Sequence, residues 1–121
     1  MIKRSYGRNM MPDLKERPTL KDLQIYMQKM CDERGWNDIT YSERFLLFTE
    51  EVGELAKSMR KAKGLFGEPA KQKRFELEEE FADVLSYLLD LANHFDVDLE
   101  TAFRQKEKVN EERLWNKTKT A

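Results

Sequence analysis

The chain has 121 residues, of which 22 are Lys or Arg and 23 are Asp or Glu, and its formal net charge is −1. This length predicts one small domain with a single core. The near-neutral charge disfavours a protein that mainly coats nucleic acid or an anionic membrane, because both need an excess of basic residues. Cys31 is the only cysteine, which excludes an internal disulfide and a cysteine zinc cage and fits a reducing cytoplasm.

The first 18 residues show no sustained periodicity, and Gly7, Pro12 and Pro18 interrupt them. No apolar stretch there is long enough for a signal or a membrane span. We therefore expect a loosely ordered arm over 1–18, a domain over 19–116 and a tail over 117–121. Neither a membrane nor a nucleic-acid polymer is an expected partner.

Four amphipathic segments follow the arm, and capping residues mark their starts. The predicted helices run from the Thr19 cap to about 34–35, from the Thr40 cap to about 63, from between 69 and 74 to about 96, and from the Asp98 cap to about 115. No segment has the pattern of a strand. These features predict an all-α four-helix bundle.

The second and third predicted helices each carry an apolar stripe that is expected to face the core. The stripes consist of Phe45, Phe48, Val52, Leu55, Ala56 and Met59, and of Leu77, Phe81, Val84, Leu85, Leu88, Leu91, Ala92 and Phe95. The connection over 64–68 contains two glycines, which suit either a hinged lid over a substrate or an ordinary loop tip.

Two pairs of acidic residues flank these stripes. Glu51 and Glu54 lie beside the stripe of the second helix, and Glu80 and Asp83 lie beside that of the third, each pair spaced i, i+3. Carboxylates gathered at the seam of two packed helices repel one another, so such a cluster is tolerable mainly when cations fill it. Oxygen ligands favour Mg²⁺, with Mn²⁺ as a substitute. The alternative is two solvated acidic faces.

The fourth predicted helix has polar residues where its inward face should be apolar. Lys106, Asn110 and Arg113 continue the face that Leu99 and Phe103 begin. One interpretation is that the two basic side chains lay their stems on the core and keep their heads in water. The other is phosphate recognition, with lysine as a point cation and arginine as a forked donor.

Together these motifs resemble the MazG-type nucleoside triphosphate pyrophosphohydrolases of the all-α NTP pyrophosphatase superfamily. The signature of that family is ExxE followed by ExxD, which stands here as Glu51-Val-Gly-Glu54 and Glu80-Phe-Ala-Asp83. Tyr87 and the series formed by Lys106, Asn110 and Arg113 add to the resemblance, which covers about residues 20–115.

The resemblance implies that the four acidic residues bind Mg²⁺ and that the α–β phosphoanhydride of a nucleoside triphosphate is hydrolysed to a monophosphate and pyrophosphate. This reaction would serve house-cleaning of the nucleotide pool. Cations offset the charge on the phosphates, and Glu51 or Glu54 would orient the nucleophile or accept its proton. Tyr87, Lys106, Asn110 and Arg113 would contact the nucleotide.

Trp36 is the remaining candidate for substrate binding. In dCTP-pyrophosphatase-like relatives a tryptophan at this place lies against the base, whereas ordinary packing is the alternative role for such a large side chain. Relatives also imply a homodimer or a homotetramer. Rival functions are a dUTPase or a phosphoribosyl-ATP pyrophosphatase, and a non-catalytic helical interaction module.

Overall fold

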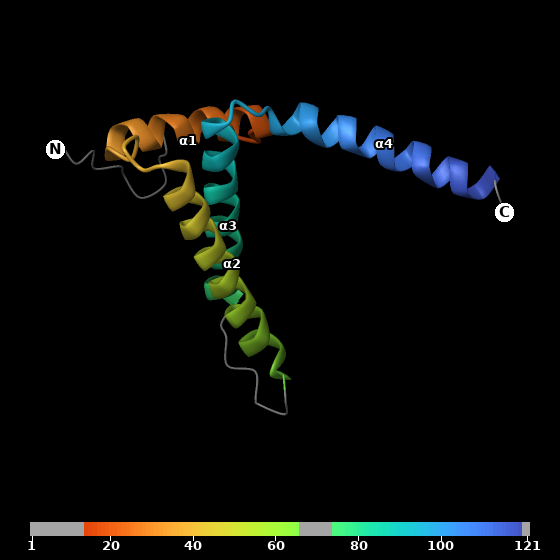
Figure 1. The fold of residues 1–121 in the computed structure, drawn as a ribbon. Helices are drawn as coiled ribbons and strands as arrows, with labels where there is room; N and C mark the ends of the chain where they lie inside the picture. The colour runs from red at the N-terminus through yellow and green to blue at the C-terminus, as the bar shows by residue number, and fades with distance from the viewer. Residues whose placement is uncertain (1–13, 66–73, 120–121) are drawn as a thin grey trace.

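The computed structural model describes residues 14–65 and 74–119, and within these ranges the chain is helical with no strand (Figure 1). The helices are α1 (Leu20–Arg34), α2 (Tyr41–Lys63), α3 (Arg74–His94) and α4 (Leu99–Lys119). The all-α prediction is confirmed, and α4 continues about one turn past its predicted end. None of the described helices is long and apolar enough to cross a membrane. Most of the predicted arm and most of the 64–68 loop lie outside the described residues.

The predicted helix starts are formed by side-chain caps. At α1, the Thr19 hydroxyl accepts from the Asp22 backbone N–H at 3.1 Å, and the Asp22 carboxylate accepts from the Thr19 N–H at 3.0 Å. These hydrogen bonds hold the pKa of Asp22 below its usual value. The Thr40 hydroxyl likewise accepts from the Glu43 N–H at α2, and the Asp98 carboxylate accepts from the Thr101 N–H at α4. Gly35 ends α1 in the left-handed conformation, which a glycine adopts without strain.

The tertiary contacts are concentrated between α2 and α3, which run antiparallel side by side (Figure 1). Helix α1 lies across one end of this pair, and α4 extends from the same end in the opposite direction (Figure 1). The buried apolar side chains of the described residues are Met27, Met30, Cys31, Leu89 and Ala92. The core of a single chain is therefore small and lies where α1 meets α3.

Most of the predicted apolar stripes remain on the surface of the single chain. Phe45 is 60% exposed, Phe81 53% and Phe95 59%. The periodicity of the sequence predicts that these faces are buried. Leu89, which lies outside the predicted stripe, is only 3% exposed. Periodicity indicates which face is apolar but not what covers it.

Helix α4 is tied to α1 by one glutamine and then leaves the other helices. The Gln24 side chain accepts from the Leu99 N–H at 3.0 Å and donates to the Val97 carbonyl at 2.8 Å. Asn93 donates to the Gln24 carbonyl at 2.8 Å and so joins the end of α3 to the same point. From 100 to 117 every residue of α4 is exposed. The four helices thus do not close into a bundle within one chain (Figure 1).

A buried ion pair fastens the loop between α1 and α2 to α3. Arg44 of α2 is 5% exposed and pairs with the Asp90 carboxylate of α3. Its guanidinium also donates to the Ile39 carbonyl at 3.0 Å and to the Trp36 carbonyl at 2.6 Å. The second Asp90 oxygen accepts from the Cys31 thiol at 3.1 Å. This network connects α1, α2, α3 and the loop over 35–40.

We predict that Arg44→Ala lowers the free energy of unfolding by about 3 to 5 kcal/mol, because it leaves the Asp90 carboxylate uncompensated in a largely buried place. Urea denaturation measures this change. Lys15→Ala is the control, since the pair of Lys15 with Asp22 lies at the surface and is worth less than about 1 kcal/mol. Equal small effects of both substitutions would contradict the prediction.

Candidate metal and nucleotide site

Packing of α2 against α3 brings three of the predicted acidic residues together. Carboxylate oxygens of Glu51, Glu80 and Asp83 all lie within 4.8 Å of one another. Glu51 and Glu80 are half-buried, and Asp83 is exposed. Glu54, one turn after Glu51, is outside this set, but its charge acts on both Glu51 and Glu80. The i, i+3 spacing places the two acids of each helix on one face, and the packing of the helices then brings three of the four together.

Among the described residues, the charges that act on Glu51 and Glu80 are all negative. Burial raises the pKa of Glu51, and the Asp83 and Glu80 carboxylates raise it further. Burial also raises the pKa of Glu80, followed by the charges of Asp83, Glu54 and Glu79. The charges that shift these two groups are all carboxylates, so protons or cations must relieve the repulsion.

One oxygen of the cluster is shielded from water without a partner. Glu80 Oε2 is buried and accepts no hydrogen bond from the residues that the structure describes, and an unpaired buried polar atom is costly. A hard divalent cation takes carboxylate oxygens as ligands and satisfies such an atom. The residues present therefore fit a Mg²⁺ or Mn²⁺ site, as the sequence predicts.

A cavity of about 260 Å³ lies beside the acidic cluster. Asp83 belongs to both, and Tyr87 and Asp90 follow it on the same face of α3. Trp36 lines the cavity from the loop after α1, together with Tyr26, Met27, Cys31, Arg34 and Ser86. The structure thus places two predicted substrate-binding residues, Trp36 and Tyr87, in one cavity next to the acids.

The two aromatic residues of the cavity differ in their surroundings. Tyr87 is half-buried, and burial followed by the charges of Glu51 and Asp83 raises the pKa of its phenol. It therefore remains a neutral hydrogen-bonding group at physiological pH. Trp36 is 39% exposed, and the Arg34 guanidinium lies 5.0 Å from the centre of its ring. This cation–π contact orients the indole at the edge of the cavity.

The predicted substrate residues of α4 are not near the acids of their own chain. Lys106, Asn110 and Arg113 are exposed on α4, which extends away from α2 and α3 (Figure 1). Asn110 donates to the Glu107 carboxylate at 3.2 Å. The expectation that these residues face the acidic seam of the same chain is not met, because the Gln24 contacts direct α4 outward.

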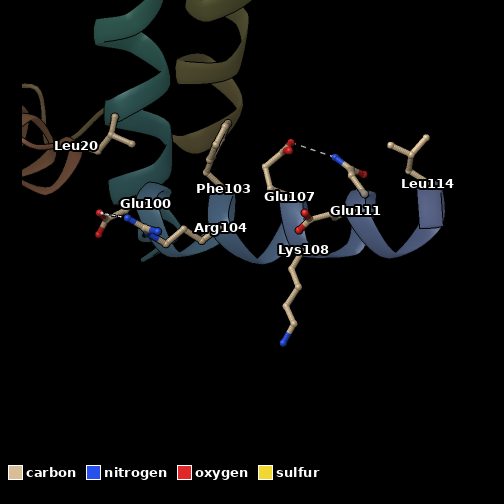
Figure 2. Close-up of a pocket in the computed structure, with 9 residues that line it drawn as sticks. Leu20, Glu100, Phe103, Arg104, Glu107, Lys108, Glu111 and Leu114 are labelled. Carbon is tan, nitrogen blue, oxygen red and sulfur yellow. Dashed lines mark hydrogen bonds and ion pairs between the residues drawn. The ribbon is translucent and has the colours of Figure 1, made fainter. Parts of the chain in front are cut away.

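The surface of α4 around Asn110 is an open groove lined by charged and polar residues together with three apolar ones. Phe103 and Leu114 stand on the same side of the helix as Glu107, and Lys108 points the opposite way (Figure 2). Leu20 of α1 completes the lining at one end. Phe103 and Leu114 are each 66% exposed. The polar and basic residues of α4 therefore border an apolar strip, formed by Phe103 and Leu114, that is largely exposed within the described part of the chain.

Comparison with known proteins decides the family. The model of the MazG nucleotide pyrophosphohydrolase domain matches residues 40–113, which hold all four acidic residues. The chain belongs to this family. It is 36% identical over 102 residues to dCTP pyrophosphatase 1 of Homo sapiens and 37% identical over 100 residues to that of Rattus norvegicus. Each match covers 79% of this chain and 59% of the relative, so the chain spans about three fifths of the length of these relatives.

Sequence reasoning missed an ion pair beside this cavity, in which Asp90 lines the cavity and Arg44 pairs with Asp90. Arg44 and Asp90 were not singled out, because an arginine in the first turns of a helix and an aspartate near the end of another are normally surface residues. The available signal was the spacing of Asp90 from Asp83. Asp90 follows Asp83 at i+7, on the face that carries the MazG acids.

We predict that Glu80→Gln stabilises the metal-free MazG domain at neutral pH, because it removes one of the repelling carboxylates. A raised pKa means that stability falls as the pH rises through the folded-state value. The two proteins should therefore be equally stable below the ordinary glutamate pKa of 4.5 and diverge above it. Thermal unfolding in a chelator measures this.

Added Mg²⁺ should reverse the order of stability and make the parent protein more stable than Glu80→Gln, since Mg²⁺ stabilises the protein that keeps all its carboxylate ligands. Glu76→Gln is the control, at an exposed position in the first turn of α3. A Glu80→Gln protein that is less stable than the parent at neutral pH without metal would contradict the prediction.

Proposed function

We propose that this protein is a Mg²⁺-dependent nucleoside triphosphate pyrophosphohydrolase that cleaves the α–β phosphoanhydride and so clears nucleotides from the pool. The observation that carries the proposal is the acidic cluster with its unpartnered Glu80 oxygen, directly beside a cavity that presents Trp36 and Tyr87. A non-catalytic interaction module has no need of strained carboxylates next to such a cavity. Cys31, an unpaired thiol, suits the reducing cytoplasm.

Each residue of the cluster has a proposed role. Glu51, Glu54, Glu80 and Asp83 hold Mg²⁺. The cation, when bound, neutralises charge that builds on the phosphates and lowers the pKa of a coordinated water. Glu51 or Glu54 orients the attacking water and takes its proton. Among the two, Glu54 lies outside the tight set of three and is better placed to act as the base.

The substrate is proposed to be a pyrimidine deoxynucleotide, with dCTP as the first candidate. Support comes from the relatives, which are named dCTP pyrophosphatase 1. The cavity is compatible with a nucleotide base, because the face of the Trp36 indole can stack on a base and the Tyr87 hydroxyl can donate or accept a hydrogen bond. A dUTPase or a phosphoribosyl-ATP pyrophosphatase remains a rival that substrate preference distinguishes.

The active form is proposed to be a homodimer or a homotetramer. The exposed apolar faces of α2 and α3 and the apolar strip of α4 exceed what a monomer normally leaves in water. The basic residues of α4, Lys106 and Arg113, complement the acidic seam in charge. We therefore propose that α4 of one copy packs on α2 and α3 of another and brings Lys106, Asn110 and Arg113 to its phosphates.

Catalysis is tested by measuring pyrophosphate release from a panel of nucleoside triphosphates with Mg²⁺ and with a chelator. We predict that Mg²⁺ is required and that Glu54→Gln lowers kcat by at least about 100-fold, because the general base is lost. Glu50→Gln is the matched control, an exposed neighbour on α2 that is expected to change kcat by less than about twofold. Absence of turnover on every triphosphate would refute the enzymatic proposal.

The shared site is tested by mixing inactive variants. We predict that Glu54→Gln and Lys106→Ala are each poorly active alone and recover activity when mixed and allowed to exchange subunits, because some sites then combine two intact halves. Phe103→Glu should shift the mass measured by light scattering towards the monomer, whereas Lys108→Glu, on the opposite side of α4 (Figure 2), should not. No recovery in a stable oligomer would refute the shared site.

A further inference from the structure

The buried pair of Arg44 and Asp90 has no part in metal binding, yet it borders the nucleotide cavity. Asp90 and Trp36 both line that cavity. Both Asp90 oxygens are occupied, one by Arg44 and the other by the Cys31 thiol. Burial, with Asp90 beside it, raises the pKa of Cys31 to about 11, so this thiol stays protonated and donating at neutral pH.

The backbone that carries Trp36 is held by Arg44. Nη2 donates to the carbonyl of Trp36 itself and Nε to the carbonyl of Ile39, while Nη1 is anchored on Asp90. A planar guanidinium makes these three contacts at fixed relative angles, which a lysine ammonium cannot reproduce. The loop over 35–40 is thereby fastened to α3 at the residue that presents the indole.

The anchor also lies on the α3 face that holds the candidate site. Asp83, Tyr87 and Asp90 are spaced i, i+4 and i+7, so Asp90 stands two turns, about 10 Å, from the acidic cluster. A shift of the anchor therefore moves the wall of the cavity around Trp36 and leaves the metal ligands where they are.

We propose that Arg44 and Asp90 are positioning residues for base recognition. They hold Trp36 at the cavity, so that the stacking surface for the base is already formed before the nucleotide binds. This inference rests on the proposed function. Neither residue is assigned a contact with the phosphates or the metal. A preformed stacking surface contributes binding energy equally in the ground state and in the transition state. The loss of this surface therefore raises KM and leaves kcat unchanged.

The test uses Arg44→Lys, which keeps a positive charge beside Asp90 and so limits the loss of stability. Steady-state kinetics are measured with dCTP and with methyl triphosphate, a substrate that has the same anhydride but no base. We expect KM for dCTP to rise about tenfold, with kcat unchanged and with kcat/KM for methyl triphosphate unchanged. Asp38→Asn in the same loop is the control for Asp90→Asn, a second variant expected to behave as Arg44→Lys does.

Trp36 fluorescence supplies a readout that does not depend on turnover. The chain has two tryptophans, so Trp115→Phe leaves Trp36 as the only reporter. In that background dCTP should quench the emission, and Arg44→Lys should raise the Kd from this titration by about the same tenfold. An equal loss of activity towards both substrates, or an unchanged KM and Kd for dCTP, would overturn the inference.

Failure of the proposed function has a different signature. If the parent protein binds dCTP by fluorescence but releases no pyrophosphate, the proposed reaction is wrong, and the effect of Arg44→Lys on Kd still decides whether the pair positions the base. If the parent protein neither binds nor hydrolyses any nucleoside triphosphate of the panel, both proposals fail.

Discussion

Repulsion between carboxylates at the contact of α2 and α3 is the constraint around which this structure is arranged. The same face of α3 carries two kinds of acidic residue. Asp90 is neutralised by a buried arginine, and its oxygens are fully hydrogen-bonded. About two to three turns away, Asp83 and Glu80 meet Glu51 among charges of the same sign. The compensated acid stabilises the fold, whereas the uncompensated acids leave the site ready for a cation.

The exposed apolar faces of the helices have a related cause, because the acidic site takes up part of the surface along which the helices pack. A small domain that gives part of its helix-packing surface to a polar site has less apolar area with which to cover its other faces. In this chain α4 is held at its first turn by Gln24, and its residues from 100 to 117 are all exposed. Association of copies would cover the apolar strip and bring basic side chains to acidic ones, which links stability to the assembly of the site.

Much of the fold could be predicted because its signals are local. Capping by Thr19, Thr40 and Asp98 depends on residues within three positions, and the structure has all three caps. The pairing of acids on α2 and α3 was predictable for the same reason, because i, i+3 spacing fixes which side chains share a helix face. Burial was not predictable in this way, as exposed Phe45 and buried Leu89 show, since it depends on which element packs where.

The sequence by itself determined the helices, the family signature and the residues offered to a metal, because these follow from short-range spacing and from the chemistry of side chains. Only the tertiary structure decided that Arg44 and Asp90 join the Trp36 loop to α3 and that Lys106 lies away from the acids of its own chain. Both outcomes depend on contacts between residues far apart in the chain, and those contacts are set by packing and hydrogen bonding rather than by periodicity.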